Sequence, residues 1–90
     1  MADRQQYCTF FLDDLFLGIE VERVQEVLRA MPLTRVPLAP PAVRGLINLR
    51  GQIVEALDLR HRLGLPGRAD VGDAMNVIVR AEDGGISLLV

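Results

Sequence analysis

The sequence predicts an all-β fold made of short strands, and three observations support this. Short apolar runs recur along the chain, and turn-forming residues bound each of them. Four prolines between positions 32 and 41 exclude a helix from the middle of the chain. The four aromatic residues all lie between positions 7 and 16, so most of any core must be Val, Leu and Ile.

Length and composition indicate one small globular domain. The chain has 90 residues, of which 50% are hydrophobic and 24% charged, which is too apolar for a disordered chain. Its net charge is −2, and every basic residue is a scattered arginine. Nucleic-acid binding normally needs a basic patch with stacking aromatic residues, so we exclude that partner.

The sequence also predicts a cytoplasmic protein. Its single cysteine, Cys8, cannot form an internal disulfide, which is typical of a reducing compartment. Met1 leads into polar residues and not into the apolar run of a signal peptide. No stretch approaches the roughly 18 apolar residues that a membrane-spanning helix needs. We therefore expect no direct insertion into a membrane.

The N-terminal part predicts a β-hairpin, with strands over Tyr7–Leu12 and Leu15–Ile19 and a turn at Asp13–Asp14. The following segment is ambiguous. Apolar residues at helical spacing over 21–28 fit a short helix, or one turn followed by a strand from about Gln25. The proline-rich stretch 32–41 then predicts an extended connection.

Residues 43–58 predict a second hairpin. Ile47 and Leu49 fall on one face of its first strand, and Asn48 and Arg50 on the other. Gly51–Gln52 permits a tight turn or a bulge before a strand over 53–57.

The remaining residues predict a short helix and two strands. Asp58 is suited to cap a helix over 59–63, which Gly64 ends. Two strands over 75–79 and 86–90 follow, with a turn at 82–85 between them.

The run Val43-Arg44-Gly45-Leu46-Ile47-Asn48-Leu49-Arg50-Gly51-Gln52-Ile53-Val54, followed by Leu57-Asp58-Leu59-Arg60, resembles the signature of the CheW family. Further matches in order are Phe16–Ile19, Val24-Gln25-Glu26-Val27 and Thr34-Arg35-Val36-Pro37. The resemblance extends from about Tyr7 to Val90. Glu55 is a departure, since the family often has proline there, and its charge predicts an edge or an exposed face.

The resemblance implies two small SH3-like β-barrels packed on each other. Residues 1–90 would then be a partial CheW-like domain with short helical turns and an incomplete second barrel. We expect the strands over 75–79 and 86–90 to open that second barrel and to lack several pairing partners. An isolated chain of this kind is expected to be poorly stable.

The resemblance also implies a function. Family members are non-catalytic adaptors that bind the cytoplasmic tip of chemoreceptors and the regulatory domain of the histidine kinase CheA. The alternative is a CheW-like regulatory domain cut from a CheA kinase, or a coupling domain fused to a receiver as in CheV. The position of Met1 just before the first strand favours a standalone coupling protein.

Five residues are candidates for the receptor or kinase interface. The resemblance implies that Val24 and Glu26 face the receptor groove together with Arg50. From spacing alone Arg50 fits a solvated strand residue better, and the signature match reverses that judgement. Arg44 and Asn48 belong to the same run; Arg44 alone fits a solvated residue, and Asn48 fits a hydrogen bond to the neighbouring loop.

No cofactor, metal or catalytic site is expected. His61 is the single histidine, and no other histidine or cysteine lies near it in the sequence. The pair Asp13–Asp14 is better explained by a turn than by acid–base chemistry. No phosphate-binding loop or nucleophile–base pattern is present.

Overall fold

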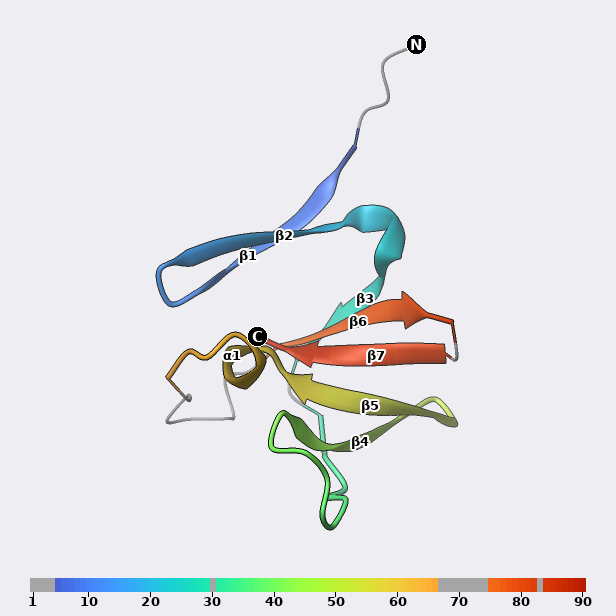
Figure 1. The fold of residues 1–90 in the computed structure, drawn as a ribbon. Coiled ribbons are helices and arrows are strands. Elements are labelled where there is room, and N and C mark those ends of the chain that lie inside the picture. Colours follow the sequence, from blue (N-terminus) through green and yellow to red (C-terminus); the bar gives the residue numbers. More distant parts are fainter. Residues whose placement is uncertain (1–4, 30, 67–74, 83) are drawn as a thin grey trace.

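The computed structural model describes residues 5–29, 31–66, 75–82 and 84–90. In the described part the elements run β1 (Tyr7–Leu12), β2 (Leu15–Glu20), a 3-10 turn (Val21–Arg23), β3 (Val24–Leu28), β4 (Val43–Leu49), β5 (Gln52–Asp58), α1 (Leu59–Arg62), β6 (Asn76–Ala81) and β7 (Gly84–Leu89). The predicted all-β fold is therefore confirmed (Figure 1). The ambiguous segment takes its second alternative, a single turn followed by a strand.

Five of these strands form one sheet, in the order β3-β6-β7-β5-β4. All neighbours are antiparallel except β5 and β7, which run parallel.

The expectation that the strands over 75–79 and 86–90 lack partners is wrong. They correspond to β6 and β7, which are central strands with a neighbour on each side. The run Val77-Ile78-Val79 is apolar because both faces of β6 are covered.

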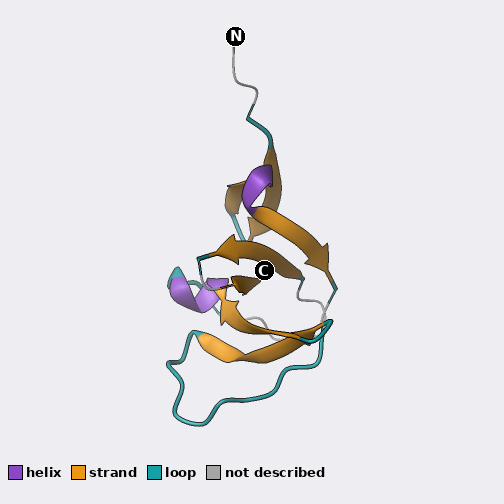
Figure 2. Cartoon of the chain, turned by 90° about the vertical axis from the view of Figure 1, so that its right-hand side faces the viewer, coloured by secondary structure: helices purple, strands orange, loops and turns teal. Residues whose placement is uncertain are grey.

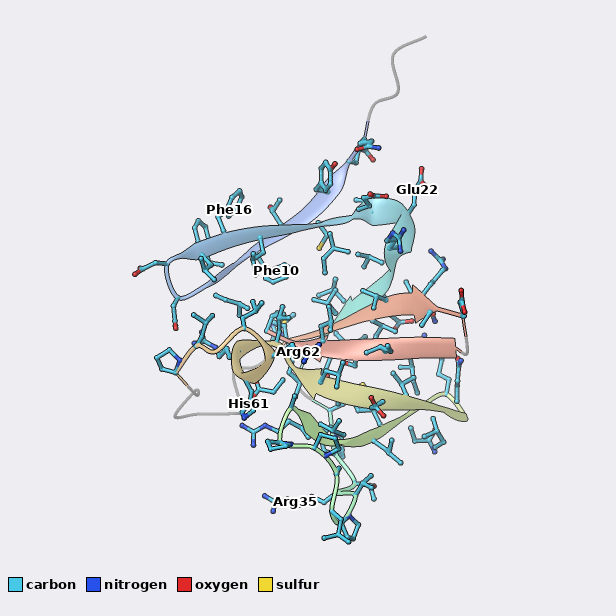
Figure 3. The ribbon with its side chains drawn as sticks, in the orientation of Figure 1. Phe10, Phe16, Glu22, Arg35, His61 and Arg62 are labelled. Carbon is cyan, nitrogen blue, oxygen red and sulfur yellow. The ribbon has the colours of Figure 1, made fainter. Side chains whose placement is uncertain are left out.

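The hairpin β1–β2 is a separate two-stranded sheet that packs on the outside of the larger one. Its turn is at Asp13–Asp14, as predicted. Figure 3 shows Phe10 pointing toward the five-stranded sheet and Phe16 pointing away from it. The inward face meets the outer face of β6 and β7 in a cluster around Leu12 and Val77. On the outward face the Phe11 and Phe16 rings lie 4.8 Å apart and are exposed.

The inner face of the five-stranded sheet encloses the second part of the core. Its buried side chains come from β4, β5, β6 and β7. The last residue of β3 and a residue of the connection that follows β3 cover them. They are Ile47, Leu49, Val54, Ala56, Ile78 and Leu89, covered by Leu28 and Met31. Ile47 and Leu49 are buried and Asn48 is exposed, as the predicted alternation requires, but β4 ends at Leu49, so Arg50 lies in the turn and not on the strand face predicted for it. Glu55 lies on the exposed face of β5, a strand inside the sheet, so its charge marks an exposed face and not an edge.

Buried polar groups inside the sheet are paired with each other. The Ser87 hydroxyl donates to the Asn76 side-chain oxygen over 2.8 Å. The Asn76 amide nitrogen donates to the Arg29 carbonyl over 3.1 Å. Both side chains are almost fully buried, so leaving either without its partner would cost on the order of 1–3 kcal/mol. This chain of hydrogen bonds links β7 and β6 to the end of β3.

The sheet curls until its two edge strands, β3 and β4, come close together. The connection that leaves β3 pairs with β4 through Thr34 and Leu46, whose backbone groups exchange hydrogen bonds of 2.9 and 2.8 Å. Figure 2 shows this connection as a wide arc beside β4. The prediction that 32–41 is not helical is confirmed, but the segment is not extended throughout, because a turn at Pro37–Leu38 interrupts it. The curled sheet and this bridge together make a small barrel.

Closure of the barrel depends on the missing side chain of Gly45. A Cβ atom at this position would lie 2.5 Å from the Thr34 carbonyl oxygen, closer than real Cβ contacts come. Gly45 also has φ 151° and lies at a register shift in the β4–β5 pairing. Gly51 differs because it occupies a tight turn at φ 88° with open space around its Cα. Both glycines serve the backbone, as the sequence predicts for Gly51.

We predict that Gly45→Ala lowers the free energy of unfolding by about 2–4 kcal/mol, because the new methyl group meets rigid backbone as well as an unfavourable φ. Gly51→Ala is the matched control and should lose only about 1 kcal/mol, from φ alone. Denaturant unfolding of both variants measures the difference. Equal losses would contradict the close approach at Thr34.

Candidate partner-binding site

The turn between β4 and β5 presents Arg50 to solvent. Arg50 and Gly51 both have positive φ, at 51° and 88°, which is the geometry of a tight two-residue hairpin. The Asn48 side-chain oxygen accepts a 2.9 Å hydrogen bond from the Gly51 backbone nitrogen. Asn48 therefore fixes the turn, in agreement with the predicted bond to the neighbouring loop. Arg50 can then occupy a conformation that a non-glycine residue seldom adopts.

Arg50 forms an ion pair with Glu26 of β3. These residues are 24 positions apart and belong to the two opposite edges of the sheet order, so only the closed barrel brings them together. The Glu26 side chain is 23% exposed and that of Arg50 is 67% exposed. An ion pair this exposed contributes roughly 0–1 kcal/mol to stability. Its main effect is to hold two charged groups in fixed positions on an accessible surface.

Val24 does not lie on the exposed surface beside Glu26 and Arg50, with which the resemblance groups it. It is half-buried and packs in the cluster between the hairpin and β6, with Leu12 and Val77. Leu28, four residues later, packs inside the barrel. The register shift between Val24 and Glu26 falls where β3 passes from one cluster to the other. The structure thus brings Glu26 and Arg50 together, while Val24 supports β3 from the hairpin side.

Arg44 belongs to the opposite end of β4. It is the extra residue of the bulge between Val43 and Gly45, and its guanidinium binds the Asp58 carboxylate through Nε at 3.1 Å and Nη2 at 3.0 Å. Asp58 is almost fully buried and also accepts a 3.2 Å hydrogen bond from the His61 backbone nitrogen. The predicted N-cap of α1 is confirmed. Its second role, as the anchor for Arg44, is not evident from sequence spacing.

Sequence reasoning also missed the ion pair between Arg60 and Asp13. Arg60 Nη1 donates to Asp13 Oδ1 over 2.6 Å, and the Arg60 side chain is only 13% exposed. The bond joins α1 to the tip of the β1–β2 hairpin, 47 positions away in sequence. Nothing local in the sequence identifies such a pair. The presence of Arg60 in the signature run was the only signal.

The described residues provide few features of a catalytic or metal centre. Within 5–29, 31–66, 75–82 and 84–90, no group of three or more His, Cys, Asp or Glu residues is placed to hold a metal ion. His61 is exposed on α1 (Figure 3). In the same described ranges no helix is long and apolar enough to cross a membrane.

Comparison with known proteins identifies the family. Residues 6–90 match the CheW-like domain. The chain belongs to this family. Its relatives include protein FrzA of Myxococcus xanthus, which is 37% identical over 75 residues, covering 83% of this chain and 46% of FrzA. Chemotaxis protein CheW of Helicobacter pylori is 31% identical over 78 residues, covering 87% of this chain and 47% of that protein.

A solved structure shows the same fold. The crystal structure of the scaffolding protein TtCheW from Thermoanaerobacter tengcongensis matches with a TM-score of 0.88 at 30% identity. The match covers 96% of this chain and 59% of TtCheW. The predicted CheW-like fold is therefore confirmed. The chain spans about half the length of the curated relatives it matches.

We predict that Asp58→Ala lowers the free energy of unfolding by about 1–3 kcal/mol, because it removes the cap of α1 and leaves Arg44 without its acceptor. Asp58→Asn keeps a good N-cap but loses the charge, so its loss should be smaller. Denaturant unfolding of both variants provides the measurement. If Asn and Ala are equally harmful, the charged bond to Arg44 outweighs the cap.

Proposed function

We propose that this chain acts as a non-catalytic chemotaxis adaptor that couples chemoreceptors to the histidine kinase CheA. Membership of the CheW-like family supports this, as do relatives named as chemotaxis proteins and a structural neighbour described as a scaffolding protein. The partners expected are the cytoplasmic tip of the receptor and the regulatory domain of the kinase. The described residues, which carry exposed charged and apolar surface, fit binding better than catalysis.

The observation that carries the proposal is the Glu26–Arg50 pair. It joins an exposed arginine to a half-buried glutamate at the barrel seam and adds little to stability, so the fold does not require it. A partner that offers its own charged groups could engage both residues without dismantling the core. We assign this surface to the receptor.

Arg44 and Asn48 take supporting places in this proposal. The hydrogen bond from Gly51 to Asn48 shapes the turn that carries Arg50. Arg44 is held by Asp58 at the far end of the same strand.

The alternative function, a regulatory domain of CheA or of a CheV-type fusion, shares the same fold, and the named relatives do not favour it.

We predict that Arg50→Ala changes the free energy of unfolding by no more than about 0.5 kcal/mol, the usual range for a surface position. It should weaken binding to a receptor cytoplasmic fragment by about 1–2 kcal/mol if Arg50 is an energetically important contact. Thermal melts and a titration with the purified fragment measure the two effects. A large loss of stability with unchanged binding would show that Arg50 serves folding only.

Reversal of the charge at Glu26 provides a second prediction. Glu26→Arg places two positive groups together and should impair receptor binding, while binding of the kinase regulatory domain should survive better. The double variant Glu26→Arg with Arg50→Glu restores the ion pair in reverse and serves as the control for folding. If receptor binding is as strong in the single variant as in the wild-type protein, the assignment of this surface fails.

A further inference from the structure

The outer face of the β1–β2 hairpin carries an exposed aromatic surface. Tyr7, Thr9 and Phe11 lie on the exposed side of β1, as the alternation of a strand requires. Phe16 of β2 lies beside Phe11 and points away from the five-stranded sheet (Figure 3). Tyr7, Phe11 and Phe16 are 51%, 68% and 62% exposed. Three of the four aromatic residues of the chain are therefore on the surface, which is typical of a face that binds a protein.

Attachment of the hairpin to the barrel does not account for this surface. The hairpin is attached by its other face, where Phe10 and Leu12 pack in the cluster around Val77. Within the described ranges, no strand pairs with the free edge of β1 or of β2. A two-stranded sheet is only marginally stable in water unless a further layer covers it. The aromatic face would therefore gain stability if a second layer packed on it.

Opposite charges flank the aromatic surface. The hairpin itself has no charged residue over 5–12 or 15–19. At its tip Asp14 is exposed. At the other end of β2, in the 3-10 turn, the Arg23 side chain is 71% exposed, and its ion-pair partner Glu20 is 3.9 Å away. This distance is long for an ion pair, so Arg23 is available to a second carboxylate. Figure 1 shows the tip and the 3-10 turn at opposite ends of β2.

The aromatic surface is complementary to itself. Thr9 and Gly18 are paired at its centre, and because Gly18 has no side chain, a second face can approach closely there. Tyr7 and Phe11 lie two residues to either side of Thr9. A two-fold rotation about the centre therefore places Tyr7 of one copy over Phe11 of the other. Because Phe11 already packs against Phe16 at 4.8 Å, each side of the axis would hold a cluster of three aromatic rings.

The same rotation brings the charged ends together. Asp14 lies four residues before Gly18 and Arg23 lies five residues after it, so the two are nearly equidistant from the axis. Asp14 of each copy would then face Arg23 of the other. An unrelated partner would have to match both the spacing and the order of these groups, whereas a second copy matches them by symmetry.

We propose that a second copy of this chain covers the outer face of the hairpin, so that two hairpins pack face to face between two barrels. Tyr7, Phe11 and Phe16 form the apolar centre of the contact, and Asp14 and Arg23 form its charged rim. Each ring would bury roughly 100 Å², so the contact is smaller than the about 800 Å² per partner of a standard interface. The dimer is therefore weak and dissociates on dilution. It uses a surface other than the proposed receptor surface and does not rest on the proposed function.

Sedimentation of the purified full chain over a range of concentrations tests the association, which should shift from monomer to dimer as the concentration rises. Tyr7 is the single tyrosine and the chain has no tryptophan, so quenching of its fluorescence by iodide should fall over the same range. Phe16→Ser should weaken association about tenfold or more and leave the melting temperature of the dilute chain unchanged, because its ring is exposed. Leu63→Ser, at an exposed apolar residue after α1, is the matched control and should keep the association.

An exchange of charges tests the two-fold arrangement. Asp14→Arg alone and Arg23→Glu alone each bring like charges together at both ends of the contact, so each variant should dimerise less than the wild-type chain. A mixture of the two variants restores opposite charges at both ends and should associate more strongly than either variant by itself. This gain should diminish at high salt.

A wild-type chain that stays monomeric up to about 1 mM would overturn the inference, since weaker contacts are not specific. So would a Phe16→Ser variant that dimerises as strongly as the wild-type chain. If the mixture of Asp14→Arg and Arg23→Glu associates no better than the separate variants, the two-fold arrangement is wrong. If the wild-type chain is monomeric and Phe16→Ser weakens binding of a receptor or kinase fragment, the face belongs to that partner and not to a second copy.

Discussion

The close approach of the Thr34 carbonyl to the Cα of Gly45 is the constraint on which the rest of the structure depends. A two-residue backbone bridge between Thr34 and Leu46 forms there, and no side chain larger than hydrogen fits between the two segments. The bridge joins the connection after β3 to β4, and so brings the two edges of a five-stranded sheet together. Without it, β3 and β4 would be separated by three intervening strands. The buried residues of the inner face would then lose the cover that Leu28 and Met31 provide.

The same closure creates the candidate receptor surface. Glu26 and Arg50 come from opposite edges of the sheet, and their ion pair forms only in the curled barrel. Because the pair is exposed, its direct contribution to stability is small. Backbone contacts and the burial of apolar side chains keep the barrel closed. The ion pair holds the Glu26 and Arg50 side chains in place on the outer surface of the barrel. This separation leaves Glu26 and Arg50 available for a partner, whereas Asp58 and Arg60, which are more buried, hold elements of the fold together.

Local sequence signals predicted most of the elements but few of their long-range neighbours. The turn at Asp13, the cap at Asp58 and the alternation of Ile47 and Leu49 follow from short-range rules, and the structure contains them. The parallel pairing of β5 with β7 leaves no such signal, because the strands are joined through α1, an undescribed stretch and β6. That pairing makes β6 and β7 central strands. The packing of Val24 against the hairpin and the bond from Arg60 to Asp13 depend on the same tertiary arrangement.

The strand β4 holds the Arg50 turn at a fixed distance from the opposite end of the barrel. β4 carries the arginine turn at one end and the bulge of Arg44 at the other, and it is bonded to β5 along its length. Thr34 fixes the connection that follows β3 to the middle of the same strand. A packed strand of this kind does not change its length, so the Arg50 turn and the Arg44 bulge are held at a fixed separation. Gly45, which permits the bridge to Thr34, therefore helps to fix the position of the turn that carries Arg50.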